Sequence, residues 1–128
     1  MAQILPELYV YVLKKLGAKV GKNVKIYGMI FEPDLLEIGD DSIIGYDALI
    51  LGHRRTHDKY IMGKIIIGKN YVIGARSVIL PNVVIEDNSV IGAQSVVLSG
   101  TKVLPNTLYA GTPAVFKKEL KTKKLDFN

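Results

Sequence analysis

Large aliphatic residues recur at every sixth position through most of the chain, and many of them are followed by glycine or another small or acidic residue. We call these recurring positions the leaders. In the first block the leader positions are Val20, Ile26, Glu32, Ile38, Ile44 and Ile50. In the second block they are Ile67, Ile73, Ile79, Ile85, Ile91, Val97, Val103, Tyr109 and Val115. Four residues after a leader, a second restricted position holds Ser42, Ala48, Ser77, Val83, Ser89, Ser95 and Thr101.

A period of six residues fits neither the α-helix, at about 3.6, nor the simple strand, at about 2. It fits a short strand followed by a turn, with three such units completing a triangular coil. Stacked coils then form parallel sheets on three faces, with the leaders pointing inward and the small position near each corner. Glycine after the leader is predicted to relieve strain where the chain bends. We therefore predict an all-β fold of about five coils.

The regular spacing is interrupted between Ile50 and Ile67, which lie 17 residues apart. One repeat plus 11 further residues accounts for this distance, so a loop is predicted to leave the coil over residues 52–64. The loop contains both histidines, His53 and His57. Because functional residues concentrate on loops that a rigid scaffold positions, this segment is the first candidate for chemistry.

The two ends of the chain depart from the repeat. A helix is predicted to begin at Pro6 and end at Gly17, with Leu8, Val12, Leu13 and Leu16 on the face that caps the coil. Residues Ala114 to Leu125 are predicted to form a Lys-rich helix or tail. Residues 1–128 then make one domain: a capping helix at 1–17, the β-helix at 18–116 and a tail at 117–128.

Composition narrows the range of functions. The chain has no cysteine, so we expect a cytoplasmic protein without disulfides or cysteine-rich metal sites. The net charge of +5 comes from lysines near the two ends, so no nucleic-acid partner is expected. Contact of the first helix with a membrane surface, through Tyr9, Tyr11, Lys14 and Lys15, is an alternative to simple capping.

Three stretches carry a resemblance to a known family: Ile67-Gly68-Lys69-Asn70-Tyr71-Val72-Ile73-Gly74-Ala75, Ile91-Gly92-Ala93-Gln94-Ser95-Val96-Val97 and Ala110-Gly111-Thr112-Pro113-Ala114. Over about residues 18–118 the sequence resembles the hexapeptide-repeat acyltransferases, whose fold is a left-handed parallel β-helix. The loop opening Gly52-His53 is similar to that of the maltose, galactoside and xenobiotic acetyltransferases. Two departures stand out, Val72 in place of the family's Trp and Leu98-Ser99 in place of Thr-Lys.

The resemblance implies a homotrimer whose active sites lie between subunits and which moves an acetyl or other acyl group from acetyl-CoA to a small acceptor. It implies His53 as the general base on the acceptor's hydroxyl or amine, because imidazole can take a proton near neutral pH. It also implies a CoA groove at Ala75 and Ala93, with no metal. The remaining residues implied to contact CoA are Lys102, Thr112, Lys117 and Lys118.

Two residues break the pattern of small or aliphatic inward side chains. Glu32 stands at a leader position, and burial of an unpaired carboxylate costs several kcal/mol. Either the coil is distorted at Glu32-Pro33-Asp34 or the carboxylates face a cleft, where they would bind substrate or orient the histidine. Tyr71 is a large ring at the small position. Glu32, Asp34 and Tyr71 are therefore candidate substrate-binding residues.

Two other functions fit the same fold. The chain is a non-catalytic binding or assembly module if Val72 and Leu98-Ser99 mark the loss of catalysis. A γ-class carbonic anhydrase would need three zinc-binding histidines from two subunits, and two histidines in one loop do not match that arrangement.

Overall fold

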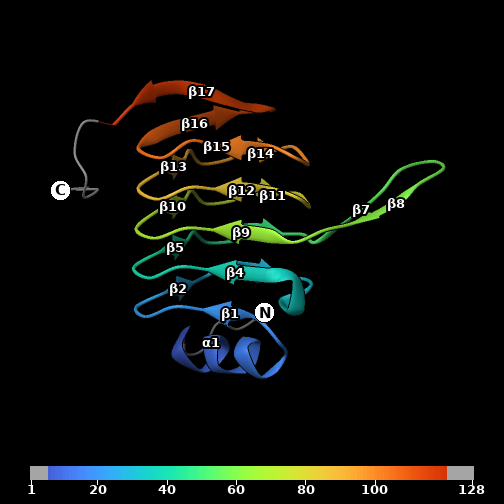
Figure 1. Cartoon of the computed structure of the whole chain (residues 1–128), viewed down its shortest axis with the longest axis vertical. Coiled ribbons are helices and arrows are strands. Elements are labelled where there is room, and N and C mark those ends of the chain that lie inside the picture. The colour runs from blue at the N-terminus through green and yellow to red at the C-terminus, as the bar shows by residue number, and fades with distance from the viewer. Residues whose placement is uncertain (1–5, 121–128) are drawn as a thin grey trace.

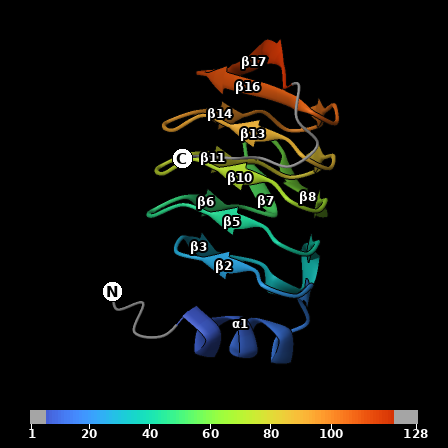
Figure 2. The ribbon, with the colours of Figure 1, turned by 90° about the vertical axis from the view of Figure 1, so that its left-hand side faces the viewer.

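The computed structural model describes residues 6–120, which form a stack of short strands wound into successive coils (Figure 1). Helix α1 (Pro6–Lys15) closes one end of the stack, and the last strand, β17 (Ala114–Glu119), lies at the other. Seen from the side, the strands of successive coils lie above one another (Figure 2). The predicted all-β, parallel coil with an N-terminal helix is confirmed.

Three sheets form the walls of the coil, and we name them faces A, B and C. Face A consists of β1 (Lys19–Val20), β4 (Leu36–Ile38), β9 (Ile65–Ile67), β12 (Val84–Ile85) and β15 (Lys102–Val103). Face B consists of β2 (Lys25–Ile26), β5 (Ile43–Ile44), β10 (Val72–Ile73), β13 (Val90–Ile91), β16 (Thr107–Gly111) and β17. Face C consists of β3 (Met29–Ile30), β6 (Leu49–Ile50), β11 (Val78–Ile79) and β14 (Val96–Val97).

The core is a column of leaders. On face B, Ile26, Ile44 and Ile73 are all 0% exposed, and strand pairing places them in register from coil to coil. On face C, Ile79 is 0% exposed as well and is in register with Ile50. The small positions are buried beside them: Ser42, Ala48, Ser77, Val83, Ser89 and Ser95. Buried serine hydroxyls at these positions form hydrogen bonds with the backbone; that of Ser77, for example, donates to the Gly92 carbonyl at 2.9 Å. The predicted inward positions are therefore confirmed along most of the chain.

The turns are built differently from the prediction. The residue with positive φ is not the glycine after the leader but the residue just before the small position, usually Asn or Asp, such as Asn88 with φ of 62°. Glycine after the leader is instead required by the neighbouring coil, because a Cβ on Gly74 would collide with the backbone of Ala93. Asn and Asp tolerate the left-handed conformation, so glycine is free for close approach between coils.

The prediction that Glu32 is an inward-pointing leader of the first coil is wrong. Ile30 fills the inward position, with 8% of its surface exposed, and Met29–Ile30 pairs with Leu49–Ile50. The corner before it is shorter, because only Tyr27 and Gly28 separate β2 from β3. The register is restored by the 3₁₀ turn η1 (Pro33–Leu35), so the coil is distorted where the sequence indicated a distortion.

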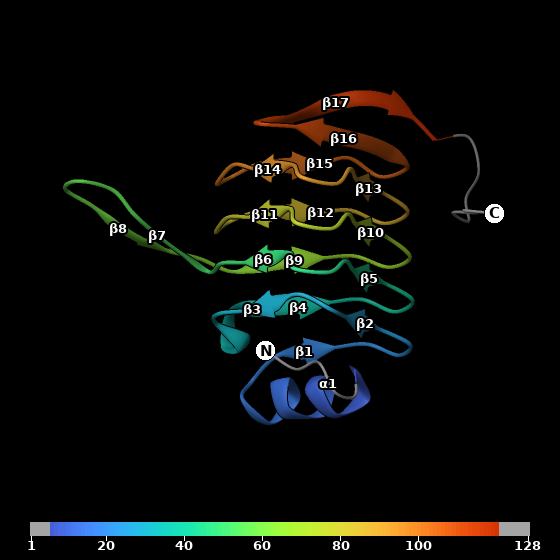
Figure 3. The ribbon, with the colours of Figure 1, turned by 180° about the vertical axis from the view of Figure 1, so that it is seen from behind.

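Residues 52–64 leave the stack as a hairpin (Figure 3). Strands β7 (His53–Arg55) and β8 (Tyr60–Met62) pair antiparallel, with His53 opposite Met62 and Arg55 opposite Tyr60. The hairpin closes at its base, where the Gly63 N–H donates to the Gly52 carbonyl at 3.0 Å. It emerges at the corner between faces C and A, because it joins β6 to β9.

Helix α1 packs through a different face from the predicted one. Leu13 is buried, whereas Leu8, Val12 and Leu16 are more than two-fifths exposed. Tyr9 attaches the helix to the first coil, since its hydroxyl accepts a hydrogen bond from the Ile30 N–H at 3.1 Å. The helix therefore caps the column through the side that carries Tyr9 and Leu13.

At the other end of the stack, Ala114–Glu119 is a strand, so the prediction of a Lys-rich helix or tail is wrong for these residues. It reverses after β16 and pairs with it antiparallel, because the last coil leaves the backbone of β16 open for a further strand. Val115 is 49% exposed, so it is not a leader and the repeat ends at Tyr109. Residues 121–128 of the expected tail lie outside the described residues.

Tyr71 lies inside the column. It is 0% exposed, and its hydroxyl has no hydrogen-bond partner in the structure. Burial raises the pKa of the Tyr71 phenol well above its usual range, because the charged form is disfavoured away from water. This location does not fit the substrate-binding role predicted for Tyr71, since no part of the side chain reaches the surface.

Tyr71→Phe is expected to raise the free energy of unfolding by about 1 kcal/mol, because an unpaired buried hydroxyl is removed while the ring stays. Above about pH 10 the Tyr71 phenol ionises in the unfolded chain but stays protonated in the folded one, so the free energy of unfolding falls as the pH rises. Tyr71→Phe has no phenol at this position and lacks this part of the pH dependence. Chemical denaturation at pH 7 and pH 10.5 measures both effects. Tyr71→Ala should instead lose about 3–5 kcal/mol. A less stable Tyr71→Phe would mean that the hydroxyl has a partner.

Candidate active site at the hairpin base

His53 and Glu32 meet at the base of the hairpin. The His53 Nδ1 and Glu32 Oε2 atoms are 2.6 Å apart, and the two side chains are 32% and 19% exposed. The other carboxylate oxygen, Oε1, accepts the Gly52 N–H at 2.7 Å. Glu32 is therefore held by two donors from the segment that carries the histidine.

This geometry fixes the orientation of the imidazole. A carboxylate can only accept, so the hydrogen on Nδ1 of a neutral His53 points at Glu32 and leaves the lone pair on Nε2 free. The arrangement is that of a histidine general base oriented by an acid. Of the two roles weighed for Glu32 facing a cleft, orientation of the histidine is the one with a contact in this structure.

Two aromatic rings flank the imidazole, and the sequence did not point to either. The Phe31 ring centroid lies 6.1 Å from that of His53, and the Tyr60 ring lies 6.2 Å away at 22°. Both side chains are about half exposed. Phe31 precedes Glu32 directly, and Tyr60 has a strand position diagonal to His53, so only the paired hairpin brings them together.

Two further predicted residues lie away from this group. Asp34 is exposed in the 3₁₀ turn, where its backbone and Cβ approach Gly17. His57 is exposed in the turn that joins β7 to β8. Tyr71 is inside the column, as described above. The structure therefore unites His53 with Glu32 but brings neither Asp34 nor Tyr71 to them.

The predicted CoA groove lies along the corner between faces B and C. Ala75 and Ala93 occur in the segments that join β10 to β11 and β13 to β14, and Gly111 follows at the same spacing. The Gln94 N–H donates to the Ala75 carbonyl at 2.9 Å, which stacks the two segments. The small residues Ala75, Ala93 and Gly111 form a stripe along this corner, beside the larger Arg76 and Gln94, and such a stripe fits a narrow, linear group such as pantetheine.

The polar residues predicted for CoA lie on three different elements. Thr112 is exposed beside this corner, and its hydroxyl donates to the Gln94 carbonyl at 3.3 Å. Lys117 and Lys118 are exposed on β17, on face B. Lys102 lies on face A and pairs with Glu86 at 3.4 Å, so it is far round the coil from Ala93.

Face C separates the two candidate regions, because the hairpin leaves at its edge with face A and the small-residue corner is its edge with face B. The residues beside the inward leaders on this face are all apolar: Met29, Phe31, Leu49, Leu51, Val78, Leu80, Val96 and Leu98. Phe31 and Leu98 are both 48% exposed. A continuous apolar face of this kind is typical of a protein interface.

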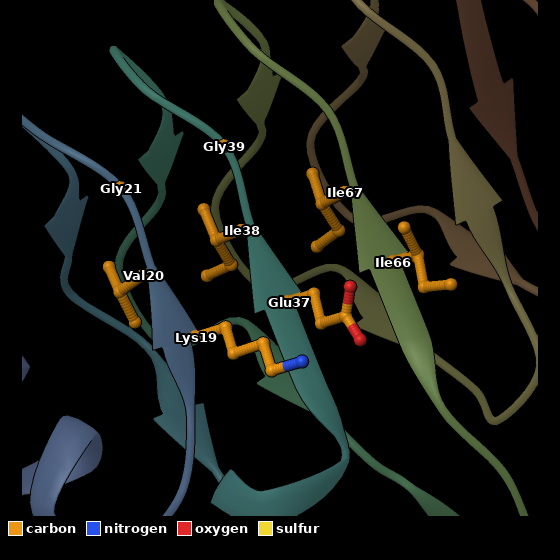
Figure 4. A pocket seen from close by; sticks show the side chains of 8 residues that line it. All are labelled: Lys19, Val20, Gly21, Glu37, Ile38, Gly39, Ile66 and Ile67. Atoms are coloured by element: carbon orange, nitrogen blue, oxygen red, sulfur yellow. The ribbon is translucent and has the colours of Figure 1, made fainter.

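Neither of two cavities in the described structure is lined by His53, Ala75 or Ala93. One is a trough of about 410 Å³ on face A, where Lys19, Glu37 and Ile66 lie on adjacent strands (Figure 4). The other, of about 440 Å³, lies between α1 and the first coil.

Within residues 6–120, no three His, Cys, Asp or Glu side chains are grouped so that they could hold a metal ion. No helix in the same residues is long and apolar enough to span a bilayer.

Comparison with known proteins places these features in a family. The family model for the bacterial transferase hexapeptide (six repeats) matches residues 64–99. YvoF, a proposed acetyltransferase of Bacillus subtilis (strain 168), is 37% identical over 70 residues, which are 52% of this chain and 41% of YvoF. The chain thus spans less than half the length of this curated relative.

Solved structures show the same fold. The hexapeptide-repeat-containing acetyltransferase VCA0836 from Vibrio cholerae O1 biovar eltor, complexed with acetyl coenzyme A, is 26% identical. It aligns with a TM-score of 0.72 over 94% of this chain and 81% of its own. A galactoside acetyltransferase in complex with coenzyme A is 28% identical, with a TM-score of 0.63 over 94% of this chain and 74% of that one.

The repeat and the fold define the class: a hexapeptide-repeat protein with a left-handed parallel β-helix. In sequence and in fold the chain is therefore similar to the hexapeptide-repeat acetyltransferases, in agreement with the resemblance seen in the sequence.

Proposed function

We propose that this protein is an acetyl-CoA-dependent acyltransferase that acts on a hydroxyl or amine of a small polar acceptor. The observation that carries the proposal is the Glu32–His53 pair at 2.6 Å, which engages Nδ1 of a partly exposed imidazole and leaves Nε2 for the acceptor. Support comes from the relatives, which are described as acetyltransferases, two of them in complex with acetyl coenzyme A or coenzyme A.

When bound, acetyl-CoA supplies the acyl group as a thioester. His53 Nε2 takes the proton from the acceptor's hydroxyl or amine as that group attacks the thioester carbonyl. The imidazolium is stabilised by the Glu32 carboxylate on Nδ1, and it then returns the proton to the departing thiolate. The products are the acylated acceptor and CoA, so His53 ends in its starting form.

We further propose that the active form is a homotrimer in which face C packs on a neighbouring chain. Face C is lined with apolar side chains and is bounded by His53 at one corner and Ala75 at the other. Burial of this face against a second copy would bring the hairpin base of one subunit near the small-residue corner of the next. Each active site would then draw on two chains.

Calorimetry with CoA tests the proposal against the non-catalytic module. The wild-type chain is expected to bind CoA with measurable heat and to sediment at three times 14.1 kDa. Ala75→Leu should weaken CoA binding at least about 10-fold by filling the corner, while Val84→Leu, on face A, should not. A wild-type protein that binds no CoA, or that transfers no acetyl group, would contradict the enzymatic proposal.

A further inference from the structure

One side of the hairpin presents a set of side chains that the proposed mechanism does not use. Directly opposed residues in an antiparallel pair share a face, and residues two apart on one strand do as well. By this register His53, Arg55, Tyr60 and Met62 lie on the same side. The ring contact between His53 and Tyr60 agrees with that placement.

Arg55 carries an unmatched charge on this side. It is exposed, and no ion pair joins it to an acidic side chain in the described part of the chain. The carboxylate at the base of the hairpin, Glu32, is engaged by His53 and Gly52. From residue 53 to residue 64 the basic residues are Arg54, Arg55, Lys59 and Lys64, with Asp58 as the acid. The hairpin therefore presents positive charge.

The aromatic rings next to His53 indicate what kind of ligand would bind beside the charge of Arg55. Phe31 and Tyr60 flank the imidazole and are about half exposed, so they offer flat apolar surface beside the reactive nitrogen. Such rings pack against the C–H face of a sugar-like ring, while a guanidinium binds phosphate or carboxylate through two parallel hydrogen bonds. The two features lie side by side, because Tyr60 is directly opposite Arg55.

Resting on the proposed function, we propose that the acceptor is a small ring-shaped polyol or amino-polyol that bears an anionic group, either phosphate or carboxylate. Arg55 binds the anion, the rings of Phe31 and Tyr60 cover the ring of the acceptor, and its reacting hydroxyl or amine lies at His53 Nε2. Arg55 is then the residue that selects charged over neutral acceptors.

Arg54 provides a matched control. It has the same charge and lies one residue away, but it is paired with Ile61 on the opposite side of the hairpin. Loss of either arginine removes one positive charge from the hairpin, so a general electrostatic effect would be equal in Arg54→Gln and Arg55→Gln. A specific contact would be lost in Arg55→Gln alone.

The test is calorimetric titration of the full chain with glucose, glucose 6-phosphate and glucuronate. We expect at least one anionic sugar to bind the wild type at least about 10-fold more tightly than glucose does. Arg55→Gln should remove that preference, Arg55→Lys should restore part of it, and Arg54→Gln should keep it. The stronger of the two anionic ligands distinguishes phosphate from carboxylate.

Three results would overturn the inference: equal affinity for neutral and anionic sugars, equal losses in Arg54→Gln and Arg55→Gln, or no binding of either anionic sugar. The test is independent of turnover, so its failure can be told from failure of the proposed function. A protein that binds anionic sugars but transfers no acetyl group would refute the enzyme and keep the Arg55 site.

Discussion

His53→Ala is expected to lower turnover at least about 100-fold while the affinity for CoA changes little. The reason is that Nε2 of His53 is the free nitrogen of an imidazole whose Nδ1 is held by Glu32 at 2.6 Å. Without it, no group at the hairpin base removes the acceptor's proton. Steady-state kinetics of CoA release, together with calorimetry of CoA, measures the two effects separately.

His57→Ala is the control for this experiment, because His57 is exposed in the turn of the hairpin and has no contact with Glu32. It should retain wild-type turnover. An active His53→Ala protein would remove His53 from the mechanism, and equal losses in the two variants would indicate disruption of the hairpin instead of loss of a base.

Glu32→Gln should lower kcat by about 10- to 100-fold, with the KM for acetyl-CoA within about threefold of the wild type. The amide can donate its N–H to Nδ1, which would place the imidazole hydrogen on Nε2, where a lone pair is needed. Because Gln keeps the shape of Glu, the bond from the Gly52 N–H can persist. The kcat loss then reports on the protonation and orientation of His53.

A purely structural role for Glu32 would give a different result. It would lower the melting temperature and leave the kcat of the folded fraction unchanged, which active-site titration combined with thermal unfolding would reveal. Glu37→Gln is the matched control, since Glu37 pairs with Lys64 at 3.5 Å on face A, away from the imidazole. That variant should keep both its kcat and its melting temperature.

The sequence predicted the column because every leader meets the same environment, so one period repeats in Ile44, Ile73 and Ile91 alike. It misplaced the leader in the first coil because a corner two residues shorter moves Ile30 inward and leaves Glu32 at the edge. The six-residue period alone cannot reveal a corner that is two residues short when the 3₁₀ turn restores the register a few residues later.

Other errors have a tertiary cause. The lysines of Ala114–Glu119 are compatible with a helix, but the open backbone of β16 pairs with this segment and makes it a strand. The contact between Glu32 and His53 joins residues 21 apart. It depends on the direction in which the hairpin leaves the corner, which local propensity does not determine. The sequence therefore offered this contact as one of several roles for Glu32 but could not choose between them.

The closed base of the hairpin has a consequence for how this protein can change. Gly52 and Gly63 are joined by a backbone hydrogen bond of 3.0 Å, and Leu51 continues the pairing with Ile79 at 2.9 Å as if nothing had been inserted. The segment between the two glycines is thus an insertion that does not interrupt the hydrogen bonding of the coil. If the proposed acceptor site is correct, exchange of residues 54–62 with those of a related protein is expected to alter acceptor choice while the coil beneath keeps its stacking.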